Sequence, residues 1–235
     1  MSEIPLICVP FAGAGASFFR PWAVPGVEGL RIVPLQPPGR EWKLDQELYR
    51  DVERAAAGLL PEVVEQIDDG RVALFGHSLG AVLAYELACK LVTIPGVEIV
   101  RLIVSGSPGP WSRRPDRASG LADGEFLRRV EEFAGYSHEA LADQEMLELI
   151  LPVLRADVEM HENYSPSSEQ PLPAPITAIR GASDCLVTSQ QAAEWSKATN
   201  RDFNLCEVDG GHMYLTADAA GLLRLIADEV ARNQH

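Results

Sequence analysis

Long apolar runs are absent from the sequence. A membrane-spanning helix needs about 18 or more consecutive apolar residues, and none of the 235 residues belongs to such a run. The first ten residues also lack the basic start and the cleavage site of a secretion signal. We therefore expect a soluble, cytoplasmic protein that does not bind membranes.

Cysteine is scarce as well. The four cysteines, Cys8, Cys89, Cys185 and Cys206, are widely scattered and form no C-x-x-C pair, which is the usual signal of a zinc or redox site. Three of them lie in or beside apolar segments. We expect these to be buried thiols, as small apolar side chains in a reducing compartment commonly are, and we expect no metal site.

Basic residues are too few for a nucleic-acid surface. Only 20 Lys and Arg residues stand against 34 Asp and Glu residues, which gives a net charge of −14. A protein that binds a polyanion needs a concentration of Lys and Arg that this chain lacks overall. The sequence therefore argues against nucleic-acid partners.

The pattern of apolar residues predicts an α/β fold. A chain of 235 residues with 46% hydrophobic content can bury one good core and is too short for two ordinary domains. Short apolar runs alternate with helical periodicity, which is typical of a mostly parallel central sheet flanked by helices. The predicted strands are Ile4–Pro10, Leu30–Leu35, Arg71–Phe75, Val100–Val104, Ile176–Arg180 and Phe203–Val208. The predicted helices of this body are Leu44–Ile67, Ala81–Val92 and Ala217–Arg232.

One segment breaks this alternation. About 70 residues separate the predicted strands Val100–Val104 and Ile176–Arg180, and they carry two amphipathic patterns, Leu121–Phe133 and Asp143–Met160. We expect a single domain over residues 1–235 with a helical lid inserted at about 108–170. The simpler interpretation, an extra packing layer, stays open because lid helices also bury one face.

Chemistry is first indicated at Gly76-His77-Ser78-Leu79-Gly80. This G-x-S-x-G sequence lies directly between a predicted strand and a predicted helix, which is the context of a nucleophile elbow. The glycines permit a sharp, strained turn that exposes the serine above the sheet. The alternative is a glycine-rich turn in which Ser78 only caps the helix.

A nucleophilic serine needs a histidine base and an acid that orients it, in the chain order Ser, Asp, His for this type of elbow. Asp184 follows the strand Ile176–Arg180, and His212 follows Phe203–Val208. Both lie just past the carboxyl ends of strands, where the catalytic groups of open α/β sheets collect. We therefore predict Ser78, Asp184 and His212 as nucleophile, acid and base.

Other candidates for these two roles fit less well. Asp209 comes only three residues before His212 and suits a surface turn, while Asp184 could itself be an aspartate that only forms a turn. None of the remaining histidines follows a predicted strand end; these are His77, His138, His161 and His235.

An acyl-transfer site also needs donors for the oxyanion. The first is expected to be the backbone N–H of Leu79, which follows the nucleophile. For the second we choose the Ala12 N–H, in a loop of small residues after the first strand (Pro10-Phe11-Ala12-Gly13-Ala14-Gly15). Phosphate binding by this loop is a weak alternative, since neither G-x-G-x-x-G nor G-x-x-x-x-G-K-[ST] is present.

Six stretches of the chain form a recognisable set: Pro10-Phe11-Ala12-Gly13, Ser17-Phe18-Phe19-Arg20, Gln36-Pro37-Pro38-Gly39-Arg40, Phe75-Gly76-His77-Ser78-Leu79-Gly80, Leu154-Arg155-Ala156-Asp157 and Gly210-Gly211-His212. Together they resemble the type II thioesterases that accompany nonribosomal peptide and polyketide synthases. The resemblance extends over nearly the whole chain, and the family's nucleophile, acid and base fall on Ser78, Asp184 and His212. Two small departures are Ala14, where a second glycine is common, and Leu79, where methionine is common.

The resemblance implies a specific activity. Type II thioesterases remove stalled or wrong acyl groups from the phosphopantetheine arms of acyl or peptidyl carrier protein domains, through an acyl-serine intermediate. It also implies a monomer that needs no cofactor of its own, since the phosphopantetheine belongs to the partner. Two alternatives stay open: a small-molecule carboxylesterase or lipase with the same triad, and a catalytically silent docking module.

A basic cluster suggests how a carrier protein could be steered. Carrier proteins are usually acidic where they are recognised, so an acidic enzyme needs a local basic patch. Arg113, Arg114 and Arg117 lie at the start of the predicted lid and could supply it. An ordinary solvated loop is at least as good an interpretation.

Overall fold

A parallel sheet forms the centre of the fold. The computed structural model describes residues 3–22, 29–112, 117–134 and 144–232. Within these ranges the sheet has six strands in the order β2-β1-β3-β4-β5-β6, and every neighbouring pair is parallel. The predicted fold class is confirmed. The strands are β1 (Ile4–Val9), β2 (Leu30–Pro34), β3 (Arg71–His77), β4 (Glu98–Ser105), β5 (Ile176–Gly181) and β6 (Phe203–Val208).

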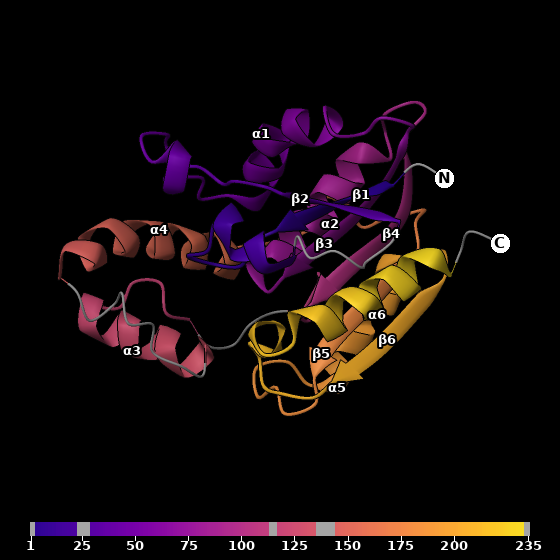
Figure 1. The fold of residues 1–235 in the computed structure, drawn as a ribbon. Helices are drawn as coiled ribbons and strands as arrows, with labels where there is room; N and C mark the ends of the chain where they lie inside the picture. The colour runs from indigo at the N-terminus through magenta and orange to yellow at the C-terminus, as the bar shows by residue number, and fades with distance from the viewer. Residues whose placement is uncertain (1–2, 23–28, 113–116, 135–143, 233–235) are drawn as a thin grey trace.

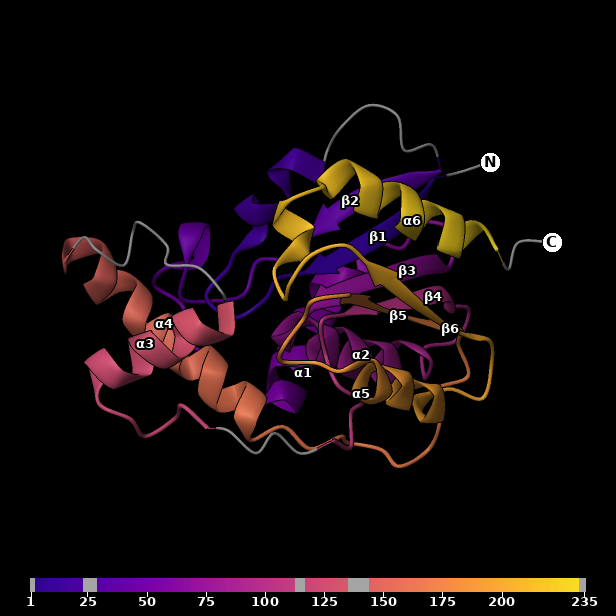
Figure 2. The same ribbon diagram turned by 90° about the horizontal axis from the view of Figure 1, so that it is seen from below.

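Helices cover both faces of the sheet (Figure 2). Helices α1 (Val52–Val64) and α2 (Leu79–Leu91) pack on one face, and α6 (Ala219–Ala231) packs on the other with the 3-10 helix η1 (Ala16–Trp22). Alternate side chains of β1 serve the two layers: Ile7 belongs to the first cluster, and Leu6 and Cys8 belong to the second. Burial on both faces explains why the strands appear as continuous apolar runs.

Helix α1 is shorter than predicted. The apolar spacing indicated a helix from Leu44 to Ile67, but α1 begins only at Val52, where the Asp51 side chain accepts a hydrogen bond from the Arg54 N–H at 2.8 Å. Leu48, part of the predicted stripe, packs instead against Gly39. Leu48 therefore has the spacing of a helical residue, although its side chain makes a contact between loop segments.

Short helical turns were not predicted. Helix α5 (Ser189–Ala193) begins with a capping box, in which the side chains of Thr188 and Gln191 each accept a hydrogen bond from the other's backbone N–H. Five residues are too few to carry an apolar period, although the cap itself is a recognisable signal. The other short turns are η2 (Glu41–Lys43), η4 (Glu194–Ala198) and η5 (Tyr214–Thr216).

Two helices lie between β4 and β5, beside the carboxyl ends of the strands (Figure 1). They are α3 (Asp123–Ala134) and α4 (Gln144–Glu162), close to both predicted ranges, although Asp143 lies outside the described residues. They share a small apolar cluster around Ala118, Phe126 and Leu154. We call residues 106–175 the helical insertion; its action as a lid stays a prediction.

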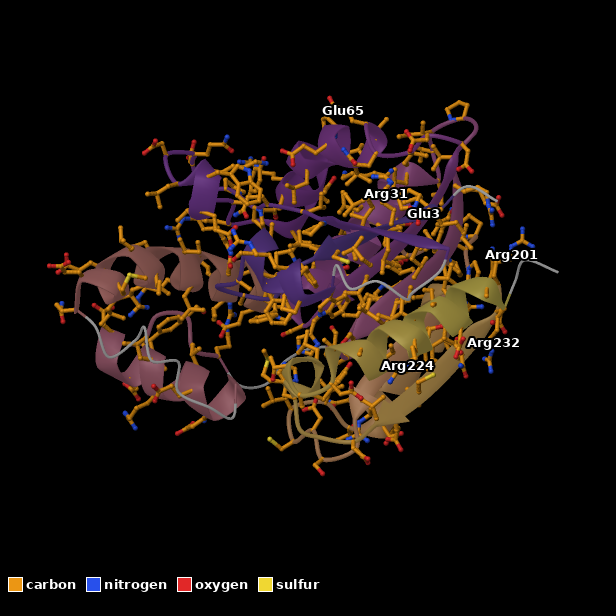
Figure 3. The ribbon with its side chains drawn as sticks, viewed as in Figure 1. Glu3, Arg31, Glu65, Arg201, Arg224 and Arg232 are labelled. Atoms are coloured by element: carbon orange, nitrogen blue, oxygen red, sulfur yellow. The ribbon has the colours of Figure 1, made fainter. Side chains whose placement is uncertain are left out.

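Charged side chains mark a part of the body remote from the insertion. Figure 3 labels six of them, and all lie away from α3 and α4. Glu3 and Arg201 precede β1 and β6, and Arg31 is the second residue of β2. The labelled residues are Glu3, Arg31, Glu65, Arg201, Arg224 and Arg232.

No helix within the described ranges is both long and apolar enough to cross a membrane.

The cysteines differ in environment. Cys8 is buried, Cys89 and Cys206 are partly buried, and Cys185 is exposed. Burial raises the pKa of the Cys8 and Cys206 thiols, and it raises the pKa of Cys89 to about 12. Because the thiolate is the reactive form, these three thiols are poor nucleophiles at neutral pH.

Candidate active site

Ser78 occupies a strained turn between a strand and a helix. Strand β3 ends at His77 and α2 begins at Leu79, so Ser78 alone makes the turn, with φ of 54° and ψ of −114°. Among the described residues other than glycine, only Glu41 shares a positive φ. A Cβ atom on Gly76 would overlap the carbonyl oxygen of Gly80. The flanking glycines are therefore required by the close packing of the turn.

Backbone hydrogen bonds tie the carboxyl ends of the strands together. The Ser78 N–H donates to the Ser105 carbonyl at 2.8 Å, and the Gly106 N–H donates to Ile179 at 2.9 Å. The Ala182 N–H continues this pattern from β5 to β6. The turns that carry Ser78, Asp184 and His212 therefore start from one continuous ladder.

Asp184 and His212 form a hydrogen-bonded pair. Oδ2 of Asp184 lies 2.9 Å from Nδ1 of His212, and Oδ1 accepts the N–H groups of Leu186 at 2.8 Å and Val187 at 3.1 Å. Burial acts to raise the pKa of Asp184, but the hydrogen bond and charge of His212 and the two N–H groups together lower it below the ordinary value. Asp184 is thus held as a carboxylate that orients the imidazole.

The turns around His212 are tightly packed. A Cβ atom on Gly181 would overlap the carbonyl oxygen of Gly211, and one on Gly106 would lie 3.2 Å from Cε1 of His212. Gly106 directly follows Ser105, whose carbonyl accepts the Ser78 N–H. The end of β4 therefore links the serine turn to the histidine.

The other histidines have different surroundings. His77 is fully buried, its ring centroid is 4.9 Å from that of His212, and its Nδ1 is 2.8 Å from Oγ of Ser105. Asp209, the competing acid, is exposed. His161 is buried near the end of α4, and His138 and His235 lie outside the described residues. Asp184 is the aspartate that the structure brings to His212.

The predicted oxyanion donors lie on the elbow itself and on the loop after β1. Leu79 begins α2, where backbone N–H groups have no carbonyl partner within the helix. Ala12 lies in the turn that the Ala14 N–H closes onto the Phe11 carbonyl at 3.0 Å. The Phe11 ring packs edge-on against His77, with centroids 5.9 Å apart. The loop after β1 and the serine turn are therefore neighbours.

Arg40 and Asp157 were not predicted to have roles. Both lie in stretches that carried the family resemblance, and their side chains form a buried ion pair with two hydrogen bonds of 2.6 and 2.9 Å. Their burial could not be read from the sequence, since each is a charged residue in a polar context. Oppositely charged residues inside two motif stretches were the only available signal.

A cleft of ≈ 540 Å³ opens between the segment after β4 and the end of α4. Arg117 lies at it and is paired with Glu162 at 3.5 Å. Arg117 also donates to Asn163, while Arg113 and Arg114 lie outside the described residues. Of the three arginines predicted to form a basic patch, the structure therefore describes Arg117 alone. Its guanidinium already contacts the carboxylate of Glu162 and the amide of Asn163. The lining residues are Val82, Ser107, Pro108, Gly109, Pro110, Trp111, Ser112, Arg117, His161, Glu162, Asn163, Tyr164, Ser165 and Pro166.

The chemistry of this arrangement is that of a serine hydrolase on an α/β-hydrolase fold, because a serine on a strained strand-to-helix turn is followed by an acid and a histidine at later strand ends. No group of three or more His, Cys, Asp or Glu side chains in the described ranges could hold a metal ion.

Comparison with known proteins identifies the family. A model of the thioesterase domain matches residues 4–230. The chain is 36% identical over 218 residues to the thioesterase PikA5 of Streptomyces venezuelae, covering 91% of this chain and 76% of that protein. The chain belongs to the thioesterase domain family, and the expected likeness to type II thioesterases is confirmed.

Solved structures agree with this assignment. The type II thioesterase BorB from the borrelidin biosynthetic cluster superimposes with a TM-score of 0.88 at 32% identity, covering 97% of this chain and 93% of BorB. The thioesterase RedJ from the prodiginine pathway of Streptomyces coelicolor gives a TM-score of 0.88 at 31% identity, with coverages of 96% and 90%. Both the fold and the class of enzyme are therefore shared.

Proposed function

We propose that this thioesterase releases acyl groups from the phosphopantetheine arms of acyl or peptidyl carrier protein domains, as an editing enzyme of a peptide or polyketide synthase. The observation that carries the proposal is the Asp184–His212 pair at 2.9 Å, together with Ser78 on a strained turn at the end of β3 in the same sheet, in a chain of the thioesterase family. The biosynthetic clusters in which BorB and RedJ occur support the choice of a carrier-bound substrate.

The first step of the proposed reaction transfers the acyl group to the enzyme. His212 accepts the proton of the Ser78 hydroxyl while the serine oxygen attacks the thioester carbonyl. The tetrahedral intermediate collapses, the C–S bond breaks, and the leaving thiolate takes the proton from His212. Asp184 keeps the imidazole oriented through Nδ1 and stabilises its charged form.

The second step restores the enzyme. His212 removes a proton from a water molecule, which attacks the acyl–Ser78 ester. The new tetrahedral intermediate collapses to a free acid, and the serine oxygen takes the proton back from His212. In both steps the backbone N–H groups of Ala12 and Leu79 hold the oxyanion.

The proposed partner is a carrier protein. It supplies the phosphopantetheine, so the mechanism requires no cofactor of the enzyme's own. A monomer suffices because one chain carries Ser78, Asp184 and His212, and we propose neither nucleic acid nor membrane as a partner. Arg113, Arg114 and Arg117 stay candidates for steering the acidic carrier.

The decisive experiment measures release of acetyl and longer acyl groups from a phosphopantetheinylated carrier protein. Wild-type enzyme is compared with Ser78→Ala and with the turnover of a matched simple oxygen ester. Fast release that depends on Ser78 and prefers the carrier substrate would support the proposal.

Two other results would exclude it. Release from the oxygen ester alone would identify a carboxylesterase with the same triad. A wild-type protein that releases neither substrate and does not react with a serine-directed fluorophosphonate would identify a docking module. Charge reversal at Arg117 tests steering separately, since it should slow release from the carrier and leave a simple thioester unaffected.

A further inference from the structure

The loop that carries Ala12 is held by side chains from distant segments. Its backbone groups bond to Arg40, which follows β2, and to Asp157 in α4, and the first residues of η1 directly after it bond to Gln36 and Glu41. We propose that the buried Arg40–Asp157 pair positions the oxyanion loop, which makes the helical insertion part of the catalytic machinery. The inference rests on the proposed function, because it assumes that Ala12 supplies an oxyanion donor.

Asp157 is the centre of this arrangement. Its Oδ2 accepts the Gly13 N–H at 2.8 Å and Nη1 of Arg40 at 2.6 Å, while its Oδ1 accepts Nη2 of Arg40 at 2.9 Å. The Asp157 side chain is only 4% exposed. One carboxylate thus fixes both the guanidinium and the peptide group that directly follows Ala12.

Arg40 holds the peptide group between Ala14 and Gly15, two peptide groups further along the loop. Its Nη1 also donates to the Ala14 carbonyl at 2.9 Å, and its Nε donates to the Pro38 carbonyl at 3.3 Å. The planar guanidinium cannot shift toward one partner without losing another. Arg40 therefore sets the distance between α4, the segment after β2 and the oxyanion loop.

Apolar contacts act on the same loop. Gly13 has φ of +79°, and a Cβ atom there would lie 3.0 Å from Cδ1 of Leu154 in α4. Ala12 packs against the apolar cluster of the insertion and also against the main core. Helix α4 therefore contacts the loop with one polar and one apolar side chain, a single turn apart.

This geometry affects the reaction because oxyanion donors act only within a narrow range of distances. Loss of the Asp157 acceptor frees the Gly13 peptide, which adjoins the Ala12 donor. A displacement of about 1 Å at such a site can reduce the rate about 10²-fold. Substrate binding away from the reacting carbonyl would not change. We therefore expect a lower kcat and an unchanged KM.

The test uses two variants that separate positioning from stability. Asp157→Ala removes the acceptor and leaves the Arg40 charge buried. The double variant Arg40→Met/Asp157→Leu replaces the ion pair by apolar side chains, a change that often preserves stability, but it still deprives Gly13 of its acceptor. Glu159→Gln is the matched control, because Glu159 lies on the same helix and pairs with Arg50 at 2.6 Å away from the loop.

Three quantities are measured for each variant: the melting temperature, kcat and KM on a simple acyl thioester, and the rate at which a fluorophosphonate modifies Ser78. Both Asp157 variants should lower kcat and the fluorophosphonate rate in parallel, by about 10- to 100-fold, with KM unchanged. The double variant should melt near the wild-type temperature and stay slow, while Glu159→Gln should match wild type.

Recovery of kcat together with stability in the double variant would overturn the proposal, and so would a loss confined to KM. The fluorophosphonate reaction reports on Ser78 and the oxyanion donors without any thioester. Wild-type protein that reacts with the probe but hydrolyses no thioester would therefore refute the proposed substrate, while the probe rates of the variants would still decide the role of Arg40 and Asp157.

Discussion

Two halves of the candidate active site are held in different ways. On one side, Ser78, Asp184 and His212 project from turns that follow β3, β5 and β6, which backbone hydrogen bonds join into one sheet. On the other side, residues 12–17 comprise the loop after β1 and the first residues of η1, and their backbone groups bond mainly to side chains from 36–41 and from α4.

The difference separates a part of the site that backbone hydrogen bonds hold from a part that side chains hold. The hydrogen bonds of a backbone ladder come from peptide groups, which every residue except proline supplies in full, and not from particular side chains. The loop side depends on particular charged and polar groups, and α4 is one of their sources. Changes in the insertion can therefore alter catalysis without touching the triad.

The largest effect is expected from Asp184→Asn. The amide keeps the shape but cannot hold His212 in the tautomer that accepts the Ser78 proton, and loss of the corresponding acid in serine proteases lowers kcat about 10⁴-fold. Steady-state kinetics on an acyl thioester measure the loss. Asp209→Asn, which removes the exposed carboxylate near His212, should leave kcat near wild type; a comparable loss there would transfer the role of the acid to Asp209.

The loop side should respond to Leu154→Ala. Leu154 is buried in the apolar cluster of the insertion and lies against Gly13, and truncation of a buried leucine costs about 2–5 kcal/mol. Hydrogen exchange should quicken at residues 12–17 and in α3 and α4, while β3 to β6 stay protected. Leu149→Ala on the exposed face of the same helix is the control. Faster exchange throughout the sheet would show that the two halves are not independent.

A smaller effect is expected at the triad side from Gly181→Ala. The added methyl group would overlap the carbonyl oxygens of Gly210 and Gly211, so the turn before His212 must shift. Overpacking of this kind costs about 1–3 kcal/mol, measured as the free energy of unfolding in urea, and kcat should fall with it. Gly211→Ala, whose methyl group meets nothing within 4 Å, should be tolerated. An equal loss of unfolding free energy in the two variants would contradict the close packing of Gly181 against Gly210 and Gly211.

The smallest effect is expected when the pH is lowered. Although burial acts to raise the pKa of Asp184, its hydrogen bonds lower it in the folded protein, so the folded carboxyl group binds a proton less tightly than the unfolded one. Its contribution to stability is therefore complete above the ordinary aspartate pKa of about 3.9 and is lost as the pH falls through the lowered folded-state value.

Urea unfolding from about pH 6 down to about pH 3 checks this expectation. The difference in unfolding free energy between wild type and Asp184→Asn should shrink as the pH falls. Asp209→Asn controls for the loss of one negative charge. A difference that grows toward acid would mean that Asp184 is protonated more readily in the folded protein.

Much of the triad side could be predicted from the sequence. Each of Ser78, Asp184 and His212 follows an apolar run that forms a strand, and the carboxyl ends of parallel strands meet at one edge. Local pattern therefore suffices to predict that they share one edge of the sheet, and the structure brings Asp184 and His212 into contact there. The predicted start of α1 was wrong because Leu48 has helical spacing but packs on a loop. Helix α5 was not predicted because five residues are too few to show a helical period.

The sequence by itself determined the order of the predicted catalytic residues along the chain. A serine elbow comes first, then an acid and then a histidine, each at the end of an apolar run. Only the tertiary structure decided that Asp157 meets Arg40, 117 residues away, and that both hold the loop beside Ala12. The physical reason is the range of the interactions. Apolar period and turn chemistry act between neighbours in the chain, whereas a buried ion pair forms only after the sheet and α4 have packed and excluded water from both charges.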